Sequence, residues 1–216
     1  MSRMRRALPI ASSEESALVG GVSEPFRSRA QAVVDAAPGS VGEKASALRT
    51  KFPCVADVSI RRPWGETRAT LVPVLRRAVA VALSRGKPVG YLGTDGAVFD
   101  APAGVFSFSG PAVDVVGASA DDLKALVREW PALCLPDSLP SPLALLSYRS
   151  PEDGWQARLR DGTTILWGRF DWTKEKLARL SEALNDAHAK APGAYAADLR
   201  FFEDGKVLLK PIGLSL

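Results

Sequence analysis

The sequence predicts an α+β fold in two parts, a small strand-helix-helix-strand-strand module followed by a mostly antiparallel β-sheet domain backed by helices. In the first part, two capped helices precede a stretch of period-two alternation. In the second part, short apolar runs are separated by Asp-Gly pairs, as is typical of an antiparallel sheet. We expect residues 1–15 to be a disordered lead, residues 16–78 to form the small module and residues 79–216 to form the sheet domain with a terminal hairpin.

Two helices are expected after a short apolar stretch at residues 17–20. Ser23 is expected to cap the first helix, and Pro25 is tolerated in its first turn. Ser40 and Glu43 have the spacing of a capping box at the start of the second helix. Each helix carries an apolar stripe at helical spacing, Phe26, Ala30, Val33 and Ala37 in the first and Val41, Ala45, Leu48 and Phe52 in the second.

Two strands complete the small module. Apolar and polar residues alternate over residues 56–61, which predicts a half-buried strand in which Ala56, Val58 and Ile60 share one face. A turn at residues 63–66 leads to a second strand over residues 67–75. Pro73 indicates that part of this second strand lies at an edge or a bulge, because proline cannot donate to a strand ladder.

The sheet domain is expected to alternate strands with two further helices. Strands at residues 79–83, 89–92 and 97–99 are linked by Arg85-Gly86-Lys87 and Asp95-Gly96, and strands at 155–159 and 163–170 form a meander. Ser119 and Asp122 cap a helix that is expected to end at Pro131, and a longer helix is expected over about residues 173–190. Their stripes are Leu123, Leu126, Val127 and Trp130, and Leu177, Leu180, Leu184 and Ala187.

The last hairpin, expected over residues 196–212, is the stretch on which function should depend. Asp204-Gly205 suits a two-residue turn, because both central positions need φ > 0. The chain ends four residues after Ile212, so we expect no later segment to cover the outer strand. An open edge of this kind offers unpaired N–H and C=O groups to a partner strand.

Composition argues against several classes of protein. The 216 residues are 46% hydrophobic and 24% charged, which is ordinary for a globular chain with a real core. The net charge is +4, and because Arg3, Arg5 and Arg6 supply three of those charges, no dense basic face for nucleic acid is expected. No apolar run reaches the length of a membrane span or of a signal-peptide core.

Residues that could carry chemistry are scarce. His188 is the single histidine and lies beside an apolar helical stripe, where a packed or solvated role is expected. Cys54 and Cys134 lack metal-like spacing and are expected to be buried thiols, although a disulfide stays open. No phosphate-binding loop and no nucleophile elbow occur. We therefore expect no catalytic residue, metal, nucleotide or other cofactor, while a carboxylate-dependent hydrolase stays open as an alternative.

The tryptophans are expected to divide between core and surface. Trp130 and Trp155 fall on apolar faces and are expected to be buried. Trp64 lies in a turn and Trp172 directly precedes a helix, so both are expected to be partly exposed.

Several motifs, in order, resemble the FtsQ/DivIB cell-division family. The strand-helix-helix-strand-strand unit resembles a POTRA module, and residues 52–67, FPCVADVSIRRPWGET, look like the end of that module in this family. The later matches are TDGAVF at residues 94–99, Asp161-Gly162 followed by LWGR at 166–169, the helix at 174–184, and DLRF at 198–201 before a glycine turn and a terminal strand. The resemblance spans residues 16–212. Cys54 and Phe201 stand where an aromatic residue and a tyrosine are usual.

The resemblance implies a divisome scaffold and not an enzyme. Such proteins lie on the extracytoplasmic (periplasmic) side of the cytoplasmic membrane, bind FtsB-like and FtsL-like proteins among other divisome components, and help control septal wall synthesis. The family has one spanning helix before the POTRA module, so membrane attachment is expected only through a helix that this chain does not contain. A POTRA-bearing component of outer-membrane assembly or secretion is a further alternative.

We expect the partner to add as a β-strand beside residues 207–210. Phe201, on the neighbouring strand, would be an apolar anchor. Arg200 would pair with an acidic partner residue, with Asp198 or with another carboxylate on the same face. Pro211 has no N–H, so the free ladder should stop near Lys210. The expected partner-binding residues are Arg200, Phe201, Gly205, Val207, Leu208, Leu209 and Lys210.

Overall fold

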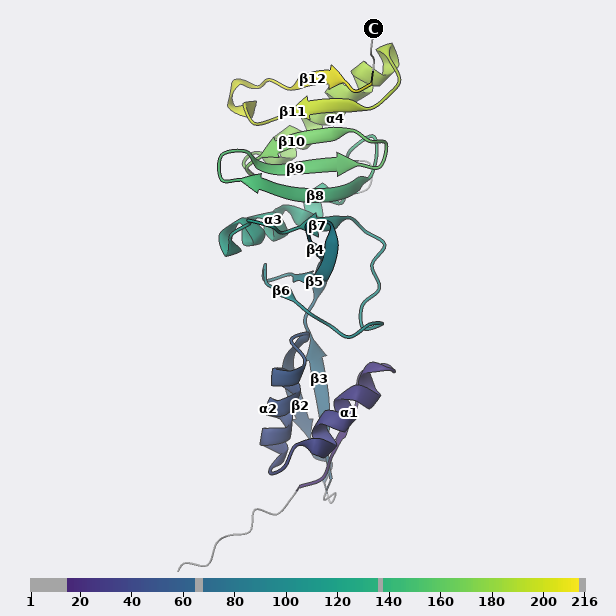
Figure 1. The fold of residues 1–216 in the computed structure, drawn as a ribbon, viewed down its shortest axis with the longest axis vertical. Coiled ribbons are helices and arrows are strands. Elements are labelled where there is room, and N and C mark those ends of the chain that lie inside the picture. Colours follow the sequence, from purple (N-terminus) through teal and green to yellow (C-terminus); the bar gives the residue numbers. More distant parts are fainter. Residues whose placement is uncertain (1–14, 65–67, 136–137, 214–216) are drawn as a thin grey trace, which may run out of the picture. The chain divides into compact units, whose positions relative to one another are not determined.

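The computed structural model describes residues 15–64, 68–135 and 138–213 of the chain (Figure 1). The chain divides into two compact units, residues 1–76 with 101–105 and residues 77–100 with 106–216. The lead expected over residues 1–15 lies outside the described residues except for Glu15, as do Gly65, Glu66 and Thr67 of the expected turn and strand. Among the residues that are described, no helix is long and apolar enough to cross a membrane.

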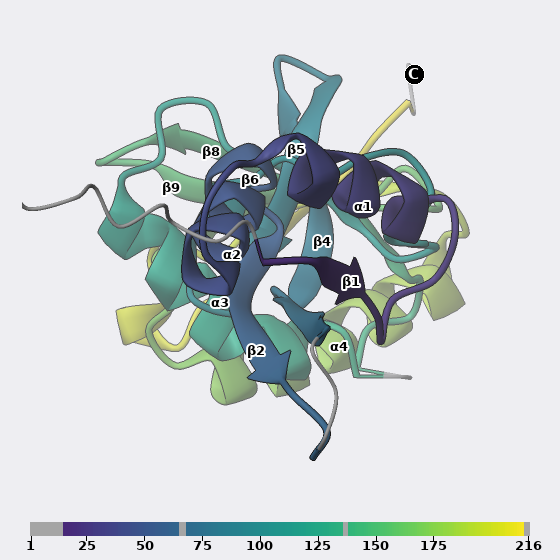
Figure 2. The same cartoon turned by 90° about the horizontal axis from the view of Figure 1, so that it is seen from below.

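The first unit has the predicted order of elements. They are β1 (Ala17–Val19), α1 (Phe26–Ala36), α2 (Val41–Lys51), β2 (Val55–Arg61) and β3 (Ala69–Leu75). The strands form a sheet in the order β1-β3-β2, in which β1 is parallel and β2 antiparallel to β3. The two helices pack against each other and lie on the same side of β1 and β2 (Figure 2). The predicted strand-helix-helix-strand-strand module is therefore confirmed.

The two helices of this unit begin differently. At α2 the predicted capping box is confirmed, since the Ser40 N–H donates to Glu43 Oε2 at 2.6 Å and Glu43 N–H donates to Ser40 Oγ. At α1 the expected Ser23 cap is wrong. The helix begins only at Phe26, and the carboxylate of Glu24 accepts the Ser28 N–H at 3.2 Å in place of a hydroxyl. The predicted stripe of α2 is buried throughout, whereas α1 buries Phe26, Ala30 and Val34 in place of Val33 and Ala37.

The strands of the small sheet explain two further observations. Ile60 is 50% exposed and Ala56 is exposed as well, while Val58 is half-buried, so the face predicted from the alternation is wrong for two of its three residues. A register shift between Val55 and Asp57 interrupts the regular pairing of β2 with β3 at Ala56. Pro73 lies in the central strand β3, but β1 pairs only with residues 69–71, so that side of Pro73 has no neighbouring strand. The prediction that part of β3 lies at an edge is confirmed.

The second unit is built on a nine-stranded sheet (Figure 1). Its order is β12-β11-β10-β9-β8-β7-β4-β5-β6, and five of the eight neighbouring pairs are antiparallel. The elements are β4 (Ala78–Ser84), β5 (Lys87–Gly93), β6 (Val98–Phe99), β7 (Ala112–Asp114), α3 (Ala120–Leu133), β8 (Leu143–Ser150), β9 (Gly154–Leu159), β10 (Thr164–Gly168), α4 (Thr173–Lys190), β11 (Tyr195–Asp198), the 3₁₀ helix η1 (Phe202–Asp204) and β12 (Leu208–Pro211).

The helices of the second unit cover its core. The capping box of Ser119 and Asp122 at α3 is confirmed, but α3 continues past Pro131 to Leu133. Because Pro131 lies in the last turn, the helix closes without its N–H, and Cys134 N–H donates to the Trp130 carbonyl at 3.1 Å. The core between sheet and helices contains the two tryptophans expected there, Trp130 and Trp155.

The exposed tryptophans are also where the sequence placed them. Trp64 is fully exposed, and Trp172 is 49% exposed at the start of α4. The two cysteines differ, since Cys54 is buried and Cys134 is exposed where the chain leaves α3, and no disulfide joins them. The expectation of a buried thiol is therefore wrong for Cys134.

Candidate functional site

The connection between β11 and β12 is not the expected two-residue turn. The strand β11 ends at Asp198, and the chain then forms η1, which Gly205 closes with φ of 67°. Leu199 explains the early end of the strand. It is fully buried and its N–H donates to the Leu166 carbonyl at 2.9 Å, so the chain turns into the core before Asp204 is reached. The predicted Asp204-Gly205 hairpin turn is therefore wrong, and Phe201 lies in the connection and not on a strand.

β12 is the outermost strand of the nine-stranded sheet (Figure 1). It pairs antiparallel with β11 in a register that sets Ala196 opposite Lys210 and Ala197 opposite Leu209. Among the residues that the structure describes, no strand pairs with the other side of β12. The outer side of β12 therefore presents main-chain groups without a ladder partner.

Two hydrogen bonds decide which of these groups face outward. The Ile212 N–H donates to the Ala194 carbonyl at 2.8 Å, so the main-chain groups of residues 212, 210 and 208 face β11. The Leu199 N–H donates to the Leu166 carbonyl on the opposite side, toward β10. Because main-chain groups alternate in direction along a strand, Asp198 then faces β12, which agrees with its partner Leu208 facing β11. The N–H and C=O of Leu209 consequently point away from the sheet. Pro211 also stands in an outward position, where its missing N–H leaves no unpaired donor.

Exposed apolar side chains lie on β12, in the connection before it and just past its end. Phe201 is 61% and Leu208 57% exposed, and Ile212, just past the strand, is 45% exposed. Val207 and Leu209 instead pack partly against the core, as the alternation of side chains along a strand requires. The edge therefore combines outward main-chain groups at Leu209 with apolar side chains on the exposed face.

Arg200 is already engaged within the chain. Its Nη2 donates to Asp198 Oδ2 at 2.8 Å, and its Nη1 donates to the carboxylate of Asp153 in the turn between β8 and β9. The hydrogen bonds from Arg200 hold the pKa of Asp198 below its ordinary value, despite the opposing effect of burial. Of the two roles expected for Arg200, the structure shows the pairing with Asp198. The sequence also allowed a pairing with another carboxylate, but it did not identify Asp153, which was explained by its Asp-Gly turn alone.

The seven predicted partner-binding residues fall into two groups. Leu208, Leu209 and Lys210 lie in β12, whereas Arg200, Phe201, Gly205 and Val207 lie in the connection that precedes it. The end of β11 and the start of β12 meet, since Asp198 pairs with Leu208. Gly205 is open on the surface, and an added Cβ would meet no atom within 4 Å.

The single histidine, His188, is packed within the second unit. His188 has a structural environment at the end of α4, where its Nε2 lies 3.1 Å from the Gly193 carbonyl and its ring stacks edge-on against Tyr195. Within the described part of the chain, no three His, Cys, Asp or Glu residues are grouped so that they could hold a metal ion.

Part of the chain matches a known protein family. The family model described as cell division protein FtsQ/DivIB, C-terminal, matches residues 82–200. The matched segment runs from within β4 to Arg200 and includes α3 and α4, but it stops before Phe201 and β12. None of the curated proteins compared with the chain matches it.

Proposed function

The chain belongs to the FtsQ/DivIB family of cell-division proteins, and we propose that it is a divisome scaffold that binds an FtsB-like partner by β-strand addition to β12. The family gives the chain a role in cell division. The observation that carries the proposed binding mode is the outward N–H and C=O of Leu209 on the outermost strand of the sheet. A partner segment that pairs there adds a tenth strand through main-chain hydrogen bonds.

Side chains beside the edge would select the partner. The exposed rings and branches of Phe201, Leu208 and Ile212 favour apolar partner residues, as is common for aromatic anchors at interfaces. Lys210 is exposed and can pair with a partner carboxylate. Arg200 is occupied by Asp198 and Asp153, so its role in binding is to hold the connection that carries Phe201.

The proposed wider role extends the part in cell division that the family supports. As a non-enzymatic scaffold without a cofactor, the chain would bring FtsB-like and FtsL-like proteins and other divisome components together and so help control septal wall synthesis. This proposal places it on the extracytoplasmic side of the cytoplasmic membrane. We further propose that residues 16–78 act as a POTRA-like domain and residues 79–216 as the partner-binding β domain.

Two proline variants test strand addition. Leu209→Pro removes an outward N–H together with the partly packed Leu209 side chain, so its thermal stability should match that of Leu209→Ala, while its affinity for an FtsB-like peptide falls by at least about tenfold, equivalent to about 1.4 kcal/mol. Leu208→Pro removes an N–H that faces β11 and should loosen β12 itself. Binding is measured by calorimetry, and Leu209→Ala, which retains the N–H, is the control for the lost side chain.

The affinities of these variants show whether the peptide binds at β12 or at another surface. If Leu209→Pro folds and binds the peptide as tightly as the parent protein does, the partner does not pair with β12. If Leu209→Ala weakens binding as much as Leu209→Pro, the side chain of Leu209 and not its main chain carries the contact, and strand addition is wrong.

A further inference from the structure

One edge of the small sheet in the first unit is closed by a side chain. β1 is an outer strand of that sheet, and in the part of the chain that the structure describes no strand pairs with its other side. The Gly20 N–H donates to the Leu71 carbonyl of β3 at 2.9 Å, and main-chain groups alternate in direction along a strand. The main-chain groups of Ala17 and Val19 therefore point away from the sheet.

Gln31 satisfies two of these outward groups from α1, which lies beside β1 (Figure 2). Its Oε1 accepts from the Val19 N–H at 2.7 Å, and its Nε2 donates to the Ala17 carbonyl at 3.1 Å. The orientation of the amide follows from these partners, because a flipped amide would set its NH2 group against the Val19 N–H. One side-chain amide thus takes the place of the N–H and C=O of a neighbouring strand.

The amide of Gln31 is itself held in place. Its Nε2 also donates to Asp35 Oδ1 at 2.8 Å, one turn further along α1, so both hydrogens of Nε2 have an acceptor. The Gln31 side chain is half-buried, and its two bonds to β1 are partly shielded from water. Because shielding strengthens a hydrogen bond, water does not readily replace the amide at this edge.

Open space adjoins β1 on the surface of the first unit. Two hollows, of ≈ 380 and ≈ 560 Å³, are both bordered by Leu18, Gln31 and Asp35. Leu18 lies between the two residues that Gln31 bonds, and its side chain is 44% exposed. The outward main-chain groups of β1 are therefore closed by the side chain of Gln31 and not by a covering segment of the described chain.

The groups that Gln31 occupies are the ones that two copies of β1 would share. In an antiparallel pair of copies related by a two-fold axis at Leu18, Ala17 of one copy lies opposite Val19 of the other. The two central hydrogen bonds of such a pair run from the Val19 N–H of each copy to the Ala17 carbonyl of the other. The Gln31 amide already holds this same donor and this same acceptor.

We propose that Gln31 closes the edge of β1 and so prevents a second copy of the chain from pairing there. An edge strand with free main-chain groups is a template for other strands, and proteins protect such edges with charges, prolines or covering segments. In this chain a side-chain amide protects the edge by occupying its hydrogen bonds. The closure concerns the first unit alone, so it is independent of the strand addition proposed for β12.

Removal of the amide from the full chain should open this edge. Gln31→Met keeps the length of the side chain without its hydrogen bonds, and Gln31→Ala is too short to reach β1 and favours the helix. In dilute solution, hydrogen exchange measured by NMR should show the Val19 N–H exchanging at least about tenfold faster in both variants, because it loses its acceptor. As the concentration rises from micromolar to millimolar, sedimentation velocity should show both variants forming dimers, and the Val19 N–H should become protected again.

Two further variants make the test specific to β1. Arg29→Met adds the same side chain at an exposed position of α1 two residues away, and it should behave as the parent protein does. Leu18→Lys, combined with Gln31→Met, sets two lysines opposite each other at the two-fold axis, where like charges oppose pairing. This double variant should form no dimers, while its Val19 N–H still exchanges fast at every concentration.

Three results would overturn the proposal. If the Val19 N–H exchanges equally fast in the parent protein and in both Gln31 variants, the amide does not hold the edge. If it exchanges faster in the variants but they stay as monomeric as the parent protein at millimolar concentration, Gln31 only fastens β1 to α1. If dimers persist in the double variant with Leu18→Lys, or form equally in Arg29→Met, the association takes place on another surface. None of these results bears on β12, because no partner peptide is added.

Discussion

Arg200 donates a hydrogen bond to the carboxylate of Asp153, a residue 47 positions earlier in the chain. This contact fastens the connection between β11 and β12 to the turn between β8 and β9. A second pair joins Arg200 to Asp198 at the end of β11. The position of Phe201, and with it the shape of the proposed partner site, therefore depends on a small cluster of charges.

Removing this cluster should destabilise the fold. Arg200 has 30% and Asp198 19% side-chain exposure, so the pair is partly shielded from water, and we expect Arg200→Ala to lower the free energy of unfolding by about 1 to 2 kcal/mol. Urea denaturation measures this loss. The control is Arg179→Ala, which breaks an exposed pair with Glu182 and should cost less than about 0.5 kcal/mol. Equal losses in the two variants would show that the cluster does not hold the connection.

The same cluster should make stability depend on pH. Because the pKa of Asp198 is lower in the folded state than in the unfolded chain, the unfolded chain takes up the proton first as the pH falls. The contribution of Asp198 is therefore complete above the ordinary aspartate pKa and is lost progressively below about pH 4. We expect Asp198→Asn to be less stable than the parent protein at pH 7 and equal to it at pH 2. If the difference in stability between Asp198→Asn and the parent protein is the same at both pH values, the pKa of Asp198 is not lowered by folding.

Gly154 should tolerate no side chain. Its φ is 65°, and a Cβ at this position would lie directly against the carbonyl of Gly168 on the neighbouring strand. We expect Gly154→Ala to lower the free energy of unfolding by more than about 3 kcal/mol, as measured by thermal or urea denaturation. The backbone strain of the left-handed conformation and the displacement of the neighbouring strand both contribute to this loss. Gly86→Ala is the control, since Gly86 has φ of 77° with open space around it and should cost only about 1 kcal/mol. A milder effect at Gly154 than at Gly86 would be evidence against this close approach.

Phe201 should matter for binding and not for folding. Because its side chain is 61% exposed, Phe201→Ala should change the free energy of unfolding by less than about 0.5 kcal/mol. The loss of the Phe201 ring should lower the affinity for an FtsB-like peptide by about tenfold or more, as is common when an aromatic anchor is removed from an interface. Leu135→Ala removes an equally exposed apolar side chain away from β12 and should leave the affinity unchanged. Unaltered binding in Phe201→Ala would remove this residue from the interface.

Local signals in the sequence account for most of the fold. The capping boxes at Ser40 and Ser119 mark α2 and α3 correctly, because both their hydrogen bonds lie within four residues. The strands β7 and β8 were missed. β7 has only three residues, and β8, LALLSYRS, opens with four apolar residues in a row, so it shows no alternation of apolar and polar residues.

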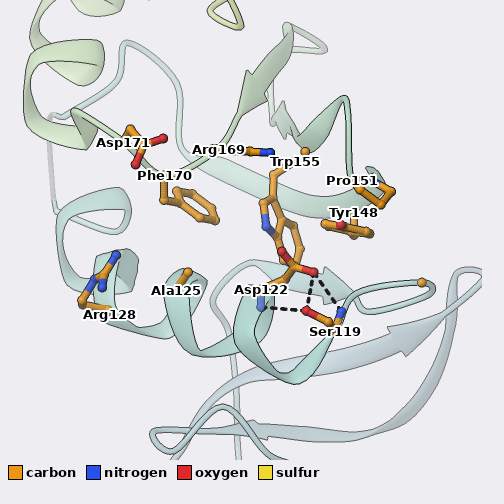
Figure 3. A pocket seen from close by; sticks show the side chains of 12 residues that line it. Ser119, Asp122, Ala125, Arg128, Tyr148, Pro151, Trp155, Arg169, Phe170 and Asp171 are labelled. Atoms are coloured by element: carbon orange, nitrogen blue, oxygen red, sulfur yellow. Dashed lines mark hydrogen bonds between the residues drawn. The ribbon is translucent and has the colours of Figure 1, made fainter.

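Long-range contacts explain what the sequence could not show. Asp204-Gly205 has the composition of a tight turn, but the burial of Leu199 and its bond to Leu166 end β11 first. The contact of Arg200 with Asp153 joins segments that only the folded sheet brings together. A pocket of ≈ 520 Å³ is likewise lined by residues of α3, β8, β9 and the loop before α4 (Figure 3), and no single stretch of sequence marks it.

The exchange rate of the Leu209 amide proton, measured by NMR with and without an FtsB-like peptide, tests strand addition most directly. In the free protein the amides of Leu208 and Lys210 should exchange slowly, because they face β11, while the outward amide of Leu209 exchanges fast. On binding, we expect the Leu209 amide alone among these three to slow by at least about tenfold, as it gains a hydrogen bond to the added strand. A bound complex in which Leu209 still exchanges as fast as in the free protein would contradict the proposed site.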